Sequence, residues 1–264
     1  MSNAPPQPFA GDFSYDFYLR LLRSSRERFA LAPLRDYVPP AQRDAPRLYV
    51  RHDIDVCLDA ALSLAELEAS IGVAATYMFI PTSTLYDVAS ANGRARLRRI
   101  QELGHEVAIH FDVATSGIAD PEDRETLVRR IDEQCAGLSE ITGSPVRSVS
   151  FHRPLPIFLK GPDRIGNRVN AYSATLMEYY CSDSAGRWRS GNPLDHLPGS
   201  AARVAQLLTH PIWWGAEHRP PAQRLEAFFQ AQVDGFDPDN CRNYDVLLRE
   251  TVPGVVRAGA NPVN

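Results

Sequence analysis

Histidines and carboxylates in this sequence of 264 residues follow five short runs that are typical of buried strands. The clusters are His52-Asp53-Ile54-Asp55, His110-Phe111-Asp112, His152-Arg153-Pro154, Ser182-Asp183-Ser184 and His210-Pro211. Because the carboxyl ends of parallel strands meet at one edge of a sheet, we expect these clusters to share one site. Imidazole and carboxylate together are ligands that zinc prefers. Such a metal lowers the pKa of a bound water and polarises a carbonyl, so the pattern indicates hydrolytic chemistry.

Each cluster also has a purely structural interpretation. Asp53 or Asp55 could cap a following helix, and His110 could be a hydrogen-bonded histidine of the core. His210 could end a strand beside a proline, and Asp183 lies in a Ser-Asp-Ser sequence that is typical of turns. Two carboxylates and a histidine within four residues exceed what one helix cap needs, which favours the interpretation as a site.

The segments between these clusters alternate between strand and helix patterns. Strands are expected over 48–53, 74–80, 105–110, 146–151, 178–181 and 204–209, and helices over 15–29, 57–71, 93–103, 121–141 and 221–233. This alternation predicts a parallel sheet, either open or closed into a barrel. No linker divides the pattern, so we expect a helix and proline-rich lead-in packed on the barrel over 1–46, one catalytic domain over 47–258 and a tail over 259–264.

The composition narrows the classes of partner. The chain has 28 basic and 32 acidic residues, a net charge of −4 and no basic run, which disfavours nucleic acid. Lys160 is the only lysine, so lysine-based Schiff-base or phosphate chemistry is excluded elsewhere. No apolar run approaches the ~18 residues of a membrane span, and nothing resembles a secretory signal. We therefore expect a cytoplasmic protein with reduced thiols, acting on a small-molecule or carbohydrate substrate, with no membrane partner and an open oligomeric state.

At these clusters the sequence resembles the polysaccharide deacetylase superfamily, also called the NodB-homology or carbohydrate esterase family 4 fold. Five segments resemble motifs of that family and follow in the same order. They are Arg51-His-Asp-Ile-Asp55, Gly104-His-Glu-Val-Ala-Ile-His110, Phe151-His-Arg-Pro154, Ser182-Asp-Ser-Ala-Gly-Arg-Trp188 and Leu208-Thr-His210. The resemblance spans 48–214. It implies the catalytic residues Asp53 as general base, His210 as general acid and Arg153 as the group that orients the base. It also implies Asp55 and His110 as metal ligands.

The resemblance further implies the fold and the reaction. The family folds as a distorted (β/α) barrel with about seven parallel strands. Its chemistry would make this chain a metal-dependent hydrolase of carbon–nitrogen bonds other than peptide bonds, removing an N-acyl group, first of all acetyl, from a sugar or sugar nucleotide. Zinc is the divalent metal expected as cofactor. Predicted to bind substrate are Asp183, Arg187, Trp188, Trp213 and Trp214, although the last two could equally belong to the core.

Two departures from the family pattern stand out. The second histidine of the family's metal motif falls at Ala114, which cannot bind a metal. Asp112, two residues after His110, and His152, at the next strand end, are the candidates for a third ligand, and we favour His152 because it keeps an Asp-His-His set. The motifs also resemble a divergent branch, similar to deacetylase-like proteins of surface-polysaccharide biosynthesis.

Two other functions stay open. One is a deformylase or another carbon–nitrogen hydrolase of a small metabolite on the same fold. The other is a catalytically degenerate binding module, to which the substitution at Ala114 gives weight.

Overall fold

The computed structural model describes residues 11–120 and 122–234, and one curled sheet of nine strands carries the polar clusters. The strands are β1 (Ala30–Ala32), β2 (Arg47–Ile54), β3 (Thr76–Phe79), β4 (Glu106–Phe111), β5 (Ser148–Phe151), β6 (Arg164–Ile165), β7 (Arg168–Asn170), β8 (Tyr180–Ser182) and β9 (Val204–Thr209). Their order is β6-β7-β5-β4-β3-β2-β9-β8, with β1 paired to β2 outside this path. All pairs are parallel except β6 with β7.

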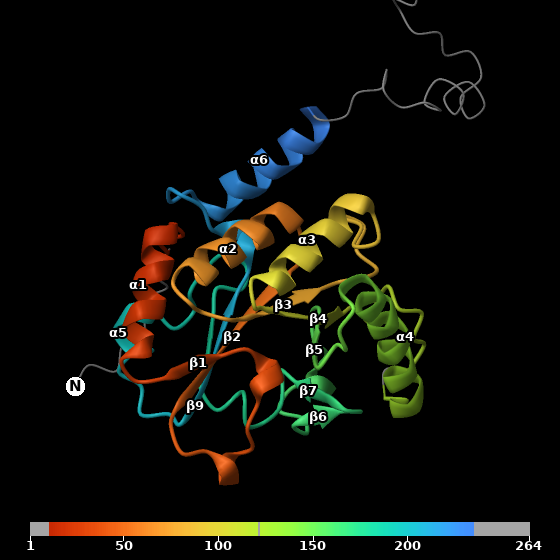
Figure 1. Ribbon diagram of the computed structural model, residues 1–264, viewed down its shortest axis with the longest axis horizontal. Helices are drawn as coiled ribbons and strands as arrows, with labels where there is room; N and C mark the ends of the chain where they lie inside the picture. Colours follow the sequence, from red (N-terminus) through yellow and green to blue (C-terminus); the bar gives the residue numbers. More distant parts are fainter. Residues whose placement is uncertain (1–10, 121, 235–264) are drawn as a thin grey trace, which may run out of the picture. The chain divides into compact units, whose positions relative to one another are not determined.

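The parallel α/β architecture predicted from the sequence is confirmed, and the sheet curls into a half-barrel with helices packed on it (Figure 1). The sheet has nine strands where about seven were predicted, because the sequence did not indicate β1, β6 and β7. These strands have three, two and three residues, which is too short for a hydrophobic period to show. Within the described strands β6 and β8 stand at opposite ends of the order, so the barrel is not closed.

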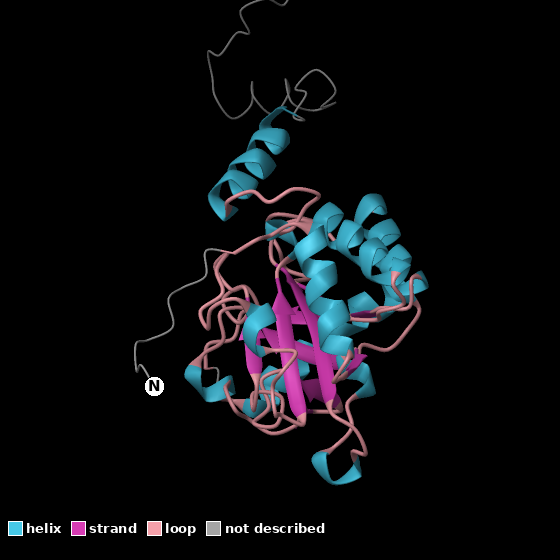
Figure 2. Ribbon diagram, turned by 90° about the vertical axis from the view of Figure 1, so that its left-hand side faces the viewer, coloured by secondary structure: helices cyan, strands magenta, loops and turns pink. Residues whose placement is uncertain are grey.

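Six α-helices are found in the described residues. They are α1 (Tyr15–Arg26), α2 (Leu58–Ser70), α3 (Ala91–Glu102), α4 (Arg124–Thr142), α5 (Pro193–His196) and α6 (Pro221–Asp234). Helices α2, α3 and α4, labelled in Figure 1, lie side by side against the sheet, and Figure 2 shows helices packed on it from another side. None of the described helices is long and apolar enough to cross a bilayer.

Local sequence explains where the helices begin and end. Helix α4 starts at Arg124, later than the predicted 121–141, because the Asp123 side chain accepts a hydrogen bond from the Thr126 N–H. It stops at Gly143, whose φ of +69° is the left-handed conformation that favours glycine. Helix α1 is shorter than the predicted 15–29, since the chain after Arg26 turns into β1.

The chain divides into two compact units, Met1–Pro221 and Ala222–Asn264, and each is considered by itself. The first unit holds the sheet and every residue of the expected site. In the second, the described residues belong to α6, which confirms the helix predicted over 221–233. The expected tail over 259–264 lies outside the described residues, and the domain boundaries stay a prediction.

Strand alternation separates the face of the sheet that the helices cover from a concave face, which carries a second hydrophobic cluster and the polar side chains near the strand ends. In β2, Leu48 and Val50 join the core that packs against the helices, whereas Arg51 and Asp53 lie on the opposite, concave face. Strand β4 repeats this arrangement, with Val107, Ile109 and Phe111 in the same core and His110 on the concave face. The period of two therefore directs the polar side chains of neighbouring strand ends to one side of the sheet.

A fully buried carboxylate, Glu68 of α2, ties the helices to the face of the sheet that they cover. It accepts hydrogen bonds from the Tyr18 hydroxyl at 2.5 Å, the Tyr77 hydroxyl at 2.7 Å and His52 Nε2 at 2.9 Å. His52 Nδ1 in turn pairs with the Thr209 hydroxyl at 2.7 Å. Burial by itself raises the pKa of Glu68, but His52, His105 and Tyr18 together outweigh this effect and the pKa is lowered. The network joins α1, α2, β2, β3 and β9.

We expect Glu68→Ala to destabilise the protein by about 3 kcal/mol or more, because it leaves buried hydroxyl and imidazole groups without their acceptor. The free energy of unfolding would be measured by denaturant titration. Glu66→Ala is the matched control, since Glu66 is exposed on the same helix and its loss should change stability by no more than about 0.5 kcal/mol. Equal destabilisation by the two variants would contradict this account of the core.

Candidate metal centre and active site

Three of the residues predicted to bind metal converge at the carboxyl ends of β2, β4 and β5. Ligand atoms of Asp55, His110 and His152 all lie within 4.8 Å of one another. His110 Nε2 is 3.3 Å and His152 Nδ1 is 3.4 Å from the same oxygen, Asp55 Oδ1. The His110 ring is fixed from behind, where its Nδ1 and the Ser150 hydroxyl share a hydrogen bond of 2.6 Å. Such an outer contact orients a metal-binding imidazole.

These three residues fit a divalent metal ion. Asp55 Oδ1 is buried and has no hydrogen-bond partner, although such an oxygen normally needs one. Burial raises the pKa of Asp55, but His110 and His152 beside it hold the pKa well below its usual range, so the carboxylate is charged. A charged, unsatisfied oxygen facing two imidazole nitrogens is the donor set of a zinc-type site, which leaves room for water as a further ligand.

Asp53, the predicted general base, lies beside this cluster in a buried ion pair. Its Oδ2 is 3.5 Å from His110 Nε2. Arg51 donates to it twice, from Nε to Oδ1 at 2.8 Å and from a terminal nitrogen to Oδ2 at 2.6 Å. Both side chains are at most 2% exposed. Burial raises the pKa of Asp53, but the Arg51 guanidinium outweighs it and keeps the carboxylate ionised.

His210, the predicted general acid, faces the cluster from the end of β9. Its Nε2 is 3.8 Å from Asp55 Oδ2, and its Nδ1 donates to Asp183 Oδ1 at 2.7 Å. Asp183 also accepts from the His210 backbone N–H and from Trp214 Nε1, so the carboxylate is fixed on three sides. Burial lowers the pKa of His210, but the hydrogen bond to Asp183 and the charges of Asp183, Asp55 and Asp53 together outweigh it and raise the pKa to about 9. At neutral pH the imidazole therefore carries a proton that its Nε2 can give away.

A pocket of about 410 Å³ opens from the cluster. Asp55 and His152 lie in its wall, and the loops after β3, β4 and β5 supply the rest. The remaining lining residues are Ile80, Thr82, Ser83, Thr84, Leu85, Asp112, Val113, Ala114, Thr115, Arg153 and Leu155. The wall is thus rich in hydroxyl groups, the kind of surface that can hydrogen bond a polar substrate.

The structure changes the predicted roles of two residues near the cluster. The guanidinium on Asp53 is that of Arg51, whereas Arg153 was expected there. Arg153 is instead exposed and lines the pocket. Asp112, the rival third ligand, accepts hydrogen bonds from the Ala114 N–H and the Thr115 hydroxyl, because β4 ends before it and a turn begins. His152 completes the cluster in its place.

None of the five residues expected to bind substrate lines this pocket. Asp183 is fully buried and holds His210, so its contacts are with the protein. Trp188 and Trp214 are almost fully buried and pack against each other in the core, with ring centroids 6.2 Å apart. Trp213 is half-buried against the same core, which removes the aromatic pair as a platform for a sugar. Arg187 is exposed, and its expected role stays a prediction.

Sequence reasoning missed Arg51 and Ser150 although the signal was present. Arg51 lies two residues before Asp53 on β2 and so faces the same side. Ser150 lies on β5, two residues before His152, which directly follows the end of that strand. Gln206 and Tyr172, which both contact the Arg51 guanidinium, come from segments far away in the chain. No sequence signal marked those two residues.

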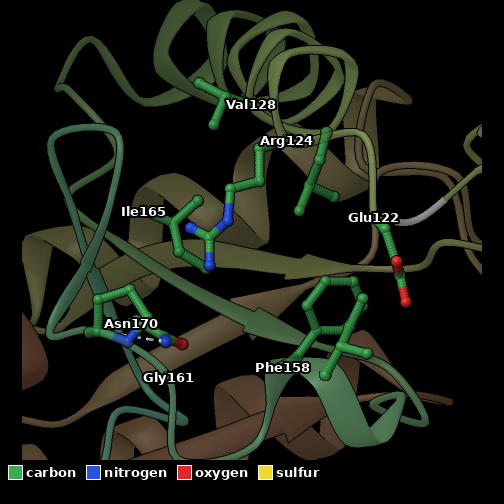
Figure 3. A pocket seen from close by; sticks show the side chains of 10 residues that line it. Glu122, Arg124, Val128, Phe158, Gly161, Ile165 and Asn170 are labelled. Atoms are coloured by element: carbon green, nitrogen blue, oxygen red, sulfur yellow. Dashed lines mark hydrogen bonds between the residues drawn. The ribbon is translucent and has the colours of Figure 1, made fainter.

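A second pocket, of about 320 Å³, lies at the start of α4 and is shown in Figure 3. Arg124, Val128, Ile165, Phe158 and Asn170 are among the side chains around it. None of the predicted site residues lines this pocket, so we assign the chemistry to the pocket beside Asp55.

Comparison with known families and with curated proteins gives no match. Similar solved structures include a family 4 carbohydrate esterase from Bacillus anthracis, at 14% identity over 90% of this chain and 95% of the other, with a TM-score of 0.43. The catalytic domain of a peptidoglycan N-acetylglucosamine deacetylase from Eubacterium rectale matches at 12% identity over 75% of this chain and 92% of the other, with a TM-score of 0.42.

A pseudoenzyme of the same family from Bacillus anthracis is also similar, at 10% identity over 72% of this chain and 62% of the other, with a TM-score of 0.39. These similar structures include members of the family whose motifs the sequence resembles.

We expect His152→Ala to reduce the bound metal well below one equivalent after dialysis against zinc, because it removes one of three protein ligands. Metal per chain would be measured by elemental analysis. Asp112→Ala is the matched control and should keep one equivalent, since the Asp112 carboxylate is used in a turn. A full equivalent of tightly bound metal in His152→Ala would show that this ligand assignment is wrong.

Proposed function

We propose that this chain is a metal-dependent hydrolase that removes an N-acyl group, in the first instance acetyl, from a sugar or sugar nucleotide. The observation that carries the proposal is the buried Asp55 Oδ1, which accepts no hydrogen bond and lies between His110 Nε2 and His152 Nδ1. We propose zinc as the ion, because two imidazoles and one carboxylate suit it better than magnesium. When bound there, such an ion polarises an amide carbonyl and lowers the pKa of water.

Asp53 is proposed as the general base of this reaction. It lies next to the cluster, and Arg51 keeps its carboxylate ionised and fixed in direction. A carboxylate held in this way accepts a proton from water as the water attacks the acyl carbon. Arg51 acts through Asp53 and is therefore a positioning residue.

His210 is proposed as the general acid. Its Nδ1 proton is fixed by Asp183, which leaves Nε2 directed toward the cluster. A protonated imidazole at that place gives its Nε2 proton to the leaving amine when the carbon–nitrogen bond breaks. Asp183 and Trp214 hold the imidazole, since both lie in the same buried hydrogen-bond network.

The direct test is release of the acyl group from a panel of N-acetyl and N-formyl sugars and sugar nucleotides. We expect acetate release by the metal-loaded protein, loss of at least 90% of the rate after chelation, and recovery on addition of zinc or cobalt. Formate as the preferred product would identify a deformylase instead. A protein that binds metal but hydrolyses no member of the panel would support the degenerate binding module and contradict the proposal.

Arg51→Lys tests the positioning of Asp53. Lysine keeps the charge but loses the planar fork, so we expect kcat to fall about 10- to 100-fold while KM and metal content stay near normal. Steady-state kinetics and elemental analysis would measure these quantities. Arg47→Lys, at the start of the same strand, is the control that should leave kcat unchanged. Equal losses of metal and activity in Arg51→Lys would place Arg51 in the scaffold alone.

A further inference from the structure

The pocket beside Asp55, His110 and His152 has one cationic side chain in its wall to which the site described above gives no role. Arg153 lies in its wall and is exposed. Within the described part of the chain, its side chain makes no hydrogen bond and no ion pair. The partner that the sequence suggested for it, Asp53, already receives two hydrogen bonds from Arg51. A guanidinium without a partner in a pocket wall is available to a ligand.

The acids near Arg153 are also committed to other contacts. Asp112 is the other carboxylate in the wall besides Asp55, and its two oxygens accept from the Ala114 N–H at 3.0 Å and the Thr115 hydroxyl at 3.1 Å. Asp55 faces the imidazoles of the cluster. A divalent ion at the cluster would balance the negative charges of Asp55 and Asp112. The positive charge of Arg153 would then give the pocket a net positive charge.

The backbone holds Arg153 in a conformation that an arginine rarely adopts. Its φ is +46°, in the left-handed region, and it stands between a residue of the metal cluster, His152, and Pro154. Such a conformation is strained for a residue with a side chain and persists only where the surrounding structure imposes it. The guanidinium therefore starts from a constrained turn directly beside the cluster.

The rest of the wall is suited to a polyhydroxylated molecule. Thr82, Ser83, Thr84 and Thr115 contribute hydroxyl groups, and the Thr82 and Thr115 hydroxyls are hydrogen bonded to each other at 2.6 Å across two loops. Hydroxyl side chains can donate to and accept from the hydroxyl groups of a sugar. A cation at the edge of such a surface favours a sugar that also carries an anion.

We propose that Arg153 binds an oxyanion on the substrate, so that the pocket selects sugars bearing a phosphate or carboxylate group over neutral ones. This inference rests on the proposed function for the location of the substrate. A guanidinium binds either anion through paired N–H donors, and loss of one such charged contact typically weakens binding about tenfold or more.

The experiment measures binding of deacylated sugars, so that turnover does not enter the result. Dissociation constants of glucosamine, glucosamine 1-phosphate, glucosamine 6-phosphate and muramic acid would be determined by calorimetry with the zinc-loaded protein. The phosphorylated and carboxylated sugars separate the two sources of the anion. We expect at least one of the three anionic sugars to bind about tenfold more tightly than glucosamine.

Two variants decide whether Arg153 is responsible. Arg153→Gln should reduce the advantage of the anionic sugar to less than about twofold. Arg99→Gln, which removes the same charge from the exposed face of α3, should keep the advantage. Equal binding of neutral and anionic sugars, an absence of binding, or an advantage that survives in Arg153→Gln would each overturn the inference. Failure of acyl release with the anion preference intact would instead contradict the proposed function alone.

Discussion

The buried ion pair between Arg51 and Asp53 is the interaction on which the concave face of the sheet depends. Two charges without access to water are tolerated only when each is fully hydrogen bonded. The guanidinium meets this condition by contacting Asp53 twice, Gln206 at 3.3 Å and the Tyr172 hydroxyl at 3.1 Å. It thereby joins β2 to β9 and to the segment after β7. It also fixes the Asp53 carboxylate, which lies next to His110.

This pair has consequences for the other side chains of the site. Since Arg51 already donates hydrogen bonds to Asp53, Arg153 after β5 is not needed there and lines the pocket instead. His152, its neighbour, lies beside Asp55 and His110. One pocket wall therefore holds Asp55, His152 and Arg153.

Much of the fold and part of the site could be predicted from the sequence. Strands that end in histidine or aspartate were recognisable because buried parallel strands are continuous apolar runs, and their polar ends mark the edge where ligands bind. The grouping of Asp55, His110 and His152 followed from that rule. The short strands β1, β6 and β7 could not be foreseen, since they are defined by pairing with distant residues and not by a local pattern. For the same reason the sequence left the place of Trp214 open, since the rings of Phe13, Phe17 and Tyr18 that pack against it come from the N-terminal segment.

The central claim is that Asp55, His110 and His152 hold one divalent ion at the base of the substrate pocket. Anomalous diffraction at the zinc edge, from crystals grown with one equivalent of zinc, tests it most directly. The account predicts a single strong peak about 2.0–2.2 Å from an Asp55 oxygen, His110 Nε2 and His152 Nδ1. A peak bound elsewhere, or density at this site that excludes His152, would contradict it.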